Sequence, residues 1–85
     1  MSAQLTMYTT QWCAFCRRLK SQLARDGLTM TEVDIARDPA AADYVMSVNG
    51  GNQTVPTVVF PDGSVLVNPS AAQVKKRMAE LATSG

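Results

Sequence analysis

The sequence predicts an α/β domain in which a four-stranded mixed sheet is flanked by three helices, in the order strand, helix, strand, helix, strand, strand, helix. Three observations predict this class. Apolar residues alternate or recur at helical spacing in successive segments, turn-forming residues separate these segments, and the 85 residues suffice for one modest core. A chain of this length buries only about 60% of its unfolded surface, which excludes two separate domains. Residues 1–85 are therefore expected to form a single domain.

The first strand and the first helix follow from local patterns. Residues 5–9 alternate in polarity and are rich in β-prone side chains, which predicts a strand. After them, Cys16, Leu19 and Leu23 recur at the spacing of one helix face. Gly27 suits the end of this helix, because glycine readily adopts the left-handed conformation that is common there.

The second strand and the second helix come next. Residues 31–35 predict a strand, and a strand–helix–strand crossover implies that the first two strands are parallel. Asp38 followed by Pro39 is typical of a helix N-terminus, and the glycines of residues 49–51 mark the helix end. The apolar stripe of this helix is expected to consist of Ala41, Tyr44, Val45 and Val48.

A hairpin and a last helix complete the order. Residues 55–60 and 64–67 are two β-rich runs, and residues 61–63 form a Pro-Asp-Gly turn between them. Residues 68–70 offer cap and first-turn chemistry for a helix. Its apolar stripe is expected to consist of Ala71, Val74, Met78 and Leu81.

Charge and hydropathy exclude several function classes. Eight Lys plus Arg stand against seven Asp plus Glu, so the net charge of +1 gives no broad attraction to nucleic acid or to a membrane surface. No apolar run approaches the roughly 18 residues that span a bilayer. Residues 1–4 lack the features of a secretory signal, so the protein is expected to be cytoplasmic. In that reducing compartment, a close cysteine pair is more often catalytic or metal-binding than a structural crosslink.

The two cysteines carry the chemistry that the sequence predicts. Cys13 comes first, at the start of the helix, where free N–H groups and the helix dipole favour a negatively charged sulfur. It is therefore the expected nucleophile in thiol–disulfide exchange. Cys16 lies one turn further along, on the apolar face, and is the expected resolving cysteine. The alternative is half of a zinc or iron–sulfur site, which would need a second copy because the chain has no His and no further Cys.

Four segments resemble a known family. They are Trp12-Cys13-Ala14-Phe15-Cys16, Val33-Asp34-Ile35, residues 48–58 with Thr54-Val55-Pro56, and Asn68-Pro69-Ser70. Together with the element order, they resemble the thioredoxin-like fold in its minimal glutaredoxin form, and within it the mycoredoxins, which use mycothiol instead of glutathione. The resemblance implies a thiol–disulfide oxidoreductase that reduces protein–mycothiol mixed disulfides. It also implies electrons from NADPH through mycothione reductase, a monomer, and mycothiol as a co-substrate with no bound cofactor.

The resemblance also implies substrate-binding residues around the cysteines. Trp12 and Phe15 would offer apolar contact surface, and a cis peptide bond between Val55 and Pro56 would leave the Val55 backbone free to pair with the substrate. The alternatives are that Trp12 and Phe15 are core residues and that Pro56 is an ordinary strand-start proline, but a position between the two cysteines turns Phe15 toward solvent more easily than toward the core. The full expected set is Trp12, Phe15, Thr54, Val55, Pro56, Asn68 and Ser70.

Two departures from the common glutaredoxin pattern favour mycothiol. Glutaredoxins usually carry a Lys three residues before the nucleophile, where this chain has Thr10, and a Gly-Gly-x-x-Asp run where residues 68–72 read Asn-Pro-Ser-Ala-Ala. Both ends of glutathione thus lose charged partners. The polar residues near the motif suit a sugar-like group, although each also fits an ordinary loop or cap role: Thr9, Thr10, Gln11, Gln53, Thr54, Asn68 and Ser70.

Two other functions stay open at this point. One is a glutaredoxin-like dithiol reductase that takes electrons from thioredoxin reductase. The other, from a different class, is a dimeric scaffold that binds a metal ion or an iron–sulfur cluster between two copies of the chain.

Overall fold

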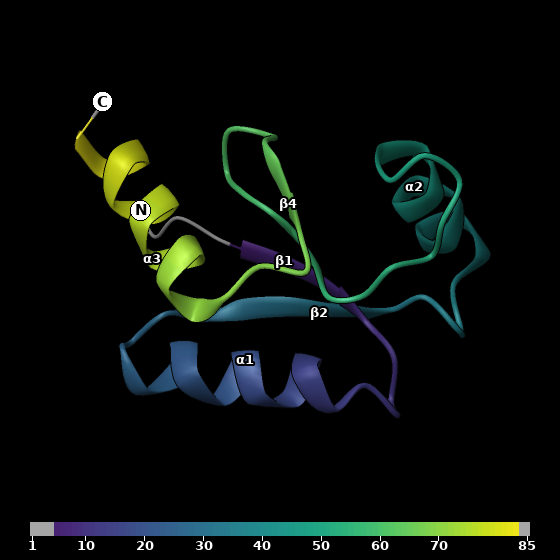
Figure 1. Cartoon of the computed structure of the whole chain (residues 1–85), viewed down its shortest axis with the longest axis horizontal. Coiled ribbons are helices and arrows are strands. Elements are labelled where there is room, and N and C mark those ends of the chain that lie inside the picture. The colour runs from purple at the N-terminus through teal and green to yellow at the C-terminus, as the bar shows by residue number, and fades with distance from the viewer. Residues whose placement is uncertain (1–4, 84–85) are drawn as a thin grey trace.

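The computed structural model describes residues 5–83, without the side chain of Thr83, and it contains the elements in the predicted order (Figure 1). Residues 1–4, on which the expectation about a secretory signal depends, lie outside the described residues. The elements are β1 (Leu5–Thr9), α1 (Ala14–Arg25), β2 (Met30–Asp34), α2 (Pro39–Val48), β3 (Thr57–Val59), β4 (Val65–Val67) and α3 (Ala71–Thr83).

The described strands form one mixed sheet with the order β2-β1-β3-β4. β1 pairs with β2 in parallel, as the crossover through α1 predicts, and pairs with β3 in the antiparallel sense. β3 and β4 form the predicted hairpin, in which Gly63 adopts a φ of +88°. β1 is therefore a central strand, and it leads directly into the loop that carries the cysteines.

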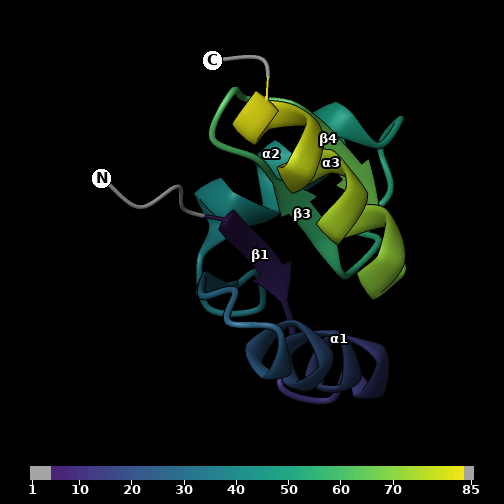
Figure 2. The same ribbon diagram turned by 90° about the vertical axis from the view of Figure 1, so that its left-hand side faces the viewer.

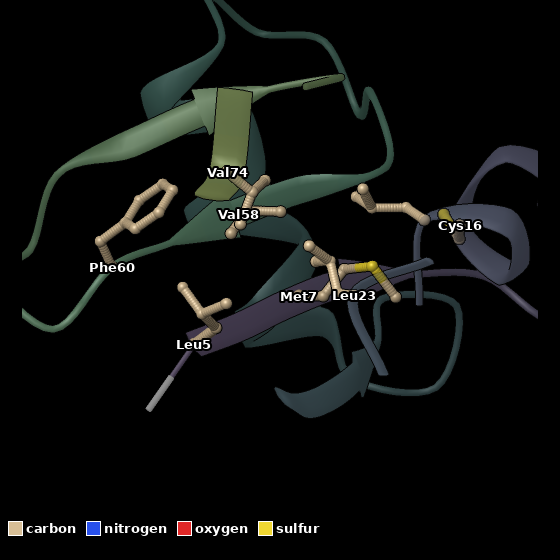
Figure 3. Packing of buried hydrophobic residues seen from close by; sticks show 8 residues of the cluster. Leu5, Met7, Cys16, Leu23, Val58, Phe60 and Val74 are labelled. Atoms are coloured by element: carbon tan, nitrogen blue, oxygen red, sulfur yellow. The ribbon is translucent and has the colours of Figure 1, made fainter. Parts of the chain in front are cut away.

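The alternation of side chains along β1 places a hydrophobic cluster on each face of the sheet. On one face, Leu5 and Met7 are buried against Leu23 of α1, Val58 of β3 and Val74 of α3 (Figure 3). Figure 2 shows α1 beneath β1 and α3 in front of β3 and β4. On the other face, Tyr8 and Val33 pack against a smaller cluster, which consists of Ile35, Ala41, Ala42 and Val45.

Helix α1 begins and ends where the sequence predicts. Its N-cap is Cys13, and its buried face consists of Cys16, Leu19 and Leu23. Gly27 has a φ of +78°, and its N–H donates to the carbonyl of Ala24 at 3.1 Å. The left-handed glycine thus terminates the helix and satisfies one of its last carbonyls.

The strands differ from the prediction at their ends. β2 runs from Met30 to Asp34 instead of over residues 31–35, and Ile35 follows it as a buried residue. The predicted strand over residues 55–60 was too long. β3 contains only Thr57–Val59, because these residues pair with β1 and Pro56 has no N–H to add to the ladder. β4 begins at Val65, one residue later than predicted.

The predicted apolar stripe of α2 was wrong at one position. Ala41 and Val45 are buried and Tyr44 is half-buried, but Val48 is 37% exposed. Ala42 is buried in its place. Val48 is the last residue of α2 and does not belong to the smaller hydrophobic cluster that packs against Tyr8 and Val33. In the stripe of α3, Val74 is buried, and Ala71, Met78 and Leu81 pack against the larger cluster as predicted.

Within residues 5–83, no helix is both long enough and apolar enough to cross a membrane.

Candidate active site

The two cysteines lie at the junction of β1 and α1. Cys13 has an extended backbone and is the N-cap of α1, and its Sγ accepts a hydrogen bond of 3.1 Å from the backbone N–H of Cys16. A backbone hydrogen bond closes the turn before Cys13, since the N–H of Cys13 donates to the carbonyl of Thr10 at 3.3 Å. Because it accepts the N–H of Cys16, the Cys13 sulfur takes the place that a side-chain oxygen occupies in an ordinary helix cap. The same sulfur is joined to the sulfur of Cys16 in a disulfide.

The environments of the two cysteines differ sharply. Cys16 is only 1% exposed and belongs to the larger hydrophobic cluster, at one end of the group drawn in Figure 3. Cys13 is half-buried at the border of the same cluster. An incoming disulfide can therefore approach Cys13 from solvent, whereas Cys16 is almost completely closed to solvent.

Trp12 and Phe15 flank Cys13 and are both exposed. The two residues are 73% and 67% exposed, which rules out the alternative that they are core residues. The guanidinium of Arg18 lies 6.0 Å from the centroid of the Phe15 ring. Two aromatic surfaces open to water beside a reactive sulfur are suited to contact a partner molecule.

The peptide bond between Val55 and Pro56 is cis, as the resemblance predicts. The loop around it is fixed by two hydrogen bonds. The Thr57 hydroxyl donates to the Thr54 carbonyl at 2.8 Å, and the Asn68 N–H donates to the Pro56 carbonyl at 2.7 Å. The side chain of Val55 packs against both hydrophobic clusters, and its backbone N–H and carbonyl have no hydrogen-bond partner within residues 5–83.

Four of the predicted substrate-binding residues share one groove, which we call the α1–α3 groove. It has a volume of about 180 Å³. It brings Phe15, Pro56, Asn68 and Ser70 together, whereas Trp12, Thr54 and Val55 do not line it. Sequence reasoning missed Arg18 and Gln22 as lining residues, although with Phe15 they recur at helical spacing. The groove is lined by Phe15, Arg18, Leu19, Gln22, Pro56, Asn68, Pro69, Ser70 and Ala71.

The N-terminus of α3, at the edge of this groove, is closed by its own side chains. The Ser70 hydroxyl accepts from the N–H of Gln73 at 3.1 Å, and the Ser70 N–H donates to the side-chain carbonyl of Gln73 at 2.8 Å. This is a capping box, so Ser70 has a structural role in addition to its place in the groove. Asn68 has a φ of 51°, in the left-handed region that Asn tolerates better than most residues.

A second and larger groove lies on the opposite side of α1, and we call it the α1–β2 groove. Its volume is about 640 Å³. It contains three of the polar residues that the sequence singled out, together with charged residues of α1 and β2 that were not in the expected substrate-binding set. The helical recurrence of Arg17, Lys20 and Ala24 was the signal for that wall. The groove is lined by Thr9, Thr10, Gln11, Arg17, Lys20, Ser21, Ala24, Glu32 and Asp34.

Among residues 5–83, no group of three or more His, Cys, Asp or Glu side chains could hold a metal ion. The disulfide-bonded pair thus has no further side-chain ligand near it within the described part of the chain.

Comparisons with known proteins agree with this arrangement. Residues 5–66 match the family model described as Glutaredoxin. A Mycobacterium tuberculosis protein named "Putative glutaredoxin Rv3198A" is 54% identical over 82 residues, which cover 96% of this chain and 98% of that protein. Mycoredoxin 1 of Corynebacterium glutamicum is 41% identical over 80 residues, which cover 94% of this chain and 99% of that protein.

Solved structures share the fold. The glutaredoxin of Archaeoglobus fulgidus has a TM-score of 0.72 at 24% identity, covering 87% of this chain and 84% of its own. The thioredoxin-like protein BC3987 has the same TM-score at 25% identity, covering 85% and 96%. The fold is thus the thioredoxin-like fold that the sequence predicts. With a family model that matches most of the chain and a cysteine pair at the start of α1, the protein belongs to the glutaredoxin family of thiol–disulfide oxidoreductases.

Proposed function

We propose that this glutaredoxin reduces mixed disulfides between protein thiols and mycothiol, with Cys13 as the nucleophile and Cys16 as the resolving cysteine. The observation that carries the proposal is the hydrogen bond from the Cys16 N–H to the Cys13 sulfur at 3.1 Å. In the reduced protein this donor and the N-terminal end of the helix dipole favour a thiolate at Cys13.

The reaction follows from thiol–disulfide exchange. The Cys13 thiolate attacks the mycothiol sulfur of the mixed disulfide, the protein thiolate leaves and takes up a proton, and Cys13 is left bonded to mycothiol. The thiolate of a second mycothiol then attacks the mycothiol sulfur and releases Cys13, with mycothiol disulfide as the product. Alternatively, Cys16 attacks the Cys13 sulfur, releases mycothiol and forms the Cys13–Cys16 disulfide. Mycothione reductase, with NADPH, would return mycothiol disulfide to the thiol.

Mycothiol is favoured over glutathione by the groups that would meet the thiol. Thr10 stands where glutaredoxins usually have a Lys, and its hydroxyl carries no charge for a glutathione carboxylate. At the start of α3, the capping box of Ser70 and Gln73 already uses two of the groups that could hold a charged amino acid end. The 41% identity to a protein named Mycoredoxin 1 supports the same choice.

The decisive experiment compares two mixed disulfides of one model peptide, one with mycothiol and one with glutathione. We expect faster turnover of the mycothiol form, and equal or faster turnover of the glutathione form would contradict the proposal. Cys13→Ser should abolish turnover. In the matched variant Cys16→Ser, with no free mycothiol added, the Cys13–mycothiol adduct should accumulate and be detected by intact-protein mass spectrometry.

A second candidate is a dithiol reductase that receives electrons from thioredoxin reductase. The Cys13–Cys16 disulfide is the form in which a dithiol reductase ends each cycle, and the Cys16 route of the mycothiol reaction ends in the same form. The two candidates are separated by measuring NADPH consumption in two assays, one coupled to mycothiol and mycothione reductase and the other coupled to thioredoxin reductase. A third possibility is the dimeric metal scaffold. It is tested against the proposed monomer without a bound cofactor by the visible absorption, the metal content and the mass in solution of freshly purified protein.

A further inference from the structure

Charge is divided unevenly between the two faces of the sheet. Helices α1 and α3 contribute to the larger hydrophobic cluster on one face, and α2 contributes to the smaller cluster on the other. α2 has no basic residue and contains Asp43. α1 has no acidic residue and contains Arg17, Arg18, Lys20 and Arg25. The net charge of +1 therefore hides a cationic helix, and the reactive cysteine is its N-cap.

Four exposed side chains form one row along α1, which we call the α1 row: Phe15, Arg18, Gln22 and Arg25. They are spaced three, four and three residues apart, so they lie on the same side of the helix. Phe15, Arg18 and Gln22 line the α1–α3 groove. Gln22 and Arg25 line a further groove of about 240 Å³, and Ala71 of α3 lines both grooves. The α1 row thus forms one continuous surface from Phe15, between the cysteines, to the last turn of the helix.

The two cations of the α1 row are not neutralised by neighbouring carboxylates. Within residues 5–83, neither Arg18 nor Arg25 forms an ion pair. Asp26, which lines the further groove with Arg25, is already paired with Lys75 at 3.0 Å. Among the described residues that line the α1–α3 groove, Arg18 is the only charged one, and its guanidinium lies 6.0 Å from the centroid of the Phe15 ring. The row is therefore complementary to a ligand that carries negative charges.

The length of the α1 row favours a polypeptide as this ligand. With a rise of about 1.5 Å per residue, Arg18 lies about 7.5 Å and Arg25 about 18 Å along α1 from Cys13. An extended chain covers about 3.3 Å per residue, so it reaches these two positions in about two and about five residues. The sugar and inositol groups of mycothiol are uncharged and leave both arginines without an anionic partner. The protein that shares the mixed disulfide with mycothiol is the molecule that can supply one.

We infer that the α1 row binds an acidic segment of the protein partner, in which acidic side chains lie about two and about five positions from the cysteine that is bonded to mycothiol. The inference rests on the proposed function, since it concerns the protein half of that mixed disulfide. The other wall of the α1–α3 groove, with Pro56, Asn68 and Ser70, is then left for mycothiol. Because both arginines are exposed, their charges act mainly on the rate of association, and salt weakens the effect.

The first test compares three peptides that differ only in charge. Each contains one cysteine bonded to mycothiol, and the residues two and five positions away on both sides are all Glu, all Gln or all Lys. We expect kcat/KM to be about tenfold higher for the Glu peptide than for the Lys peptide at low salt, and less than about threefold higher in about 0.5 M NaCl. The rate with dithiothreitol measures the intrinsic reactivity of each peptide and corrects for it. Equal corrected values, or a preference that salt does not reduce, overturn the inference.

Two variants each remove one cation from the α1 row. Arg18→Gln and Arg25→Gln should each lower the Glu-over-Lys ratio of kcat/KM by about threefold, because each removes one attraction to Glu and one repulsion of Lys. Lys76→Gln is the matched control, since Lys76 is exposed on α3 and lines neither groove of the α1 row, and its ratio should stay at the wild-type value. If Lys76→Gln lowers the ratio as much as the other two variants, net charge and not the α1 row is responsible, and the inference is overturned.

A binding measurement without chemistry separates this inference from the proposed function. The Glu peptide, with Ser in place of its cysteine, is titrated into the wild-type protein at low salt. It should shift the backbone NMR signals of Arg18 and Arg25 and leave that of Asp43 in place, whereas the Lys peptide should leave Arg18 and Arg25 unchanged. No shift with the Glu peptide, or equal shifts with both peptides, overturns the inference. If the wild-type protein turns over none of the mycothiol mixed disulfides, the proposed function is overturned, and this titration still decides whether the α1 row binds an acidic segment.

Discussion

The backbone N–H of Cys16 points at the sulfur of Cys13, 3.1 Å away, while the side chain of Cys16 is buried at 1% exposure. One residue thus has two functions in the site. Its backbone stabilises negative charge on the first sulfur, and its side chain holds a second sulfur inside the core, one helical turn away. This single geometry predicts that the two thiols differ in reactivity.

In the reduced protein, Cys13 should be alkylated faster than Cys16 at neutral pH, by at least about tenfold, because the thiolate is the reactive form and access is unequal. Iodoacetamide labelling followed by peptide mass mapping measures both rates in one sample. Cys16→Ser is the control and should keep the fast rate at Cys13. Equal rates at the two sulfurs would contradict the assignment of their roles.

Burial in the sheet should decide the effect of shortening a valine. Val58 of β3 is 0% exposed, and Val67 of the paired strand β4 is 38% exposed. The same Val→Ala change can therefore be compared at a buried and at an exposed position of one hairpin. Val58→Ala should lower the free energy of unfolding by about 2–3 kcal/mol, from lost burial plus a cavity, and Val67→Ala by less than about 1 kcal/mol. Urea unfolding measures both, and similar losses would show that the core is not where the structure has it.

The N-cap of α2 should contribute measurably to stability. Asp38 Oδ1 accepts from the N–H of Ala41 at 3.2 Å, so Asp38→Ala leaves that donor without its partner and should cost about 1 kcal/mol. Asp43→Ala removes the same charge from an exposed position in the middle of the helix. It should change the free energy of unfolding by less than about 0.5 kcal/mol. Equal effects would mean that charge, and not capping, is responsible.

Stability should decrease at high pH partly because of Tyr8. Burial, with smaller contributions from Tyr44 and Asp38, raises the pKa of Tyr8 above its usual value of 10.0. Above about pH 10 the unfolded chain therefore loses this proton before the folded chain does, and the free energy of unfolding falls as pH rises. Urea unfolding at pH values from about 9 to 11 should give a shallower fall for Tyr8→Phe than for wild type. Identical slopes would contradict the shift.

Local chemistry explains why most elements were predictable. Cys13 and Asp38 cap their helices through contacts within three residues, and Gly27 ends a helix by its own backbone conformation. Such features need no distant partner. The strand ends were less predictable, since β3 is limited to Thr57–Val59 by its pairing with β1, some fifty residues earlier in the chain.

For the site, the sequence alone determined the cysteine pair, its place at the start of a helix and the apolar face that buries Cys16. The tertiary structure decided how the polar residues divide. Thr10 and Gln11 share the α1–β2 groove with Glu32, whereas Asn68 lies with Pro56 in the α1–α3 groove. No spacing rule could make this division, because it depends on how α1 packs across the sheet and which distant strand and helix it meets on each side.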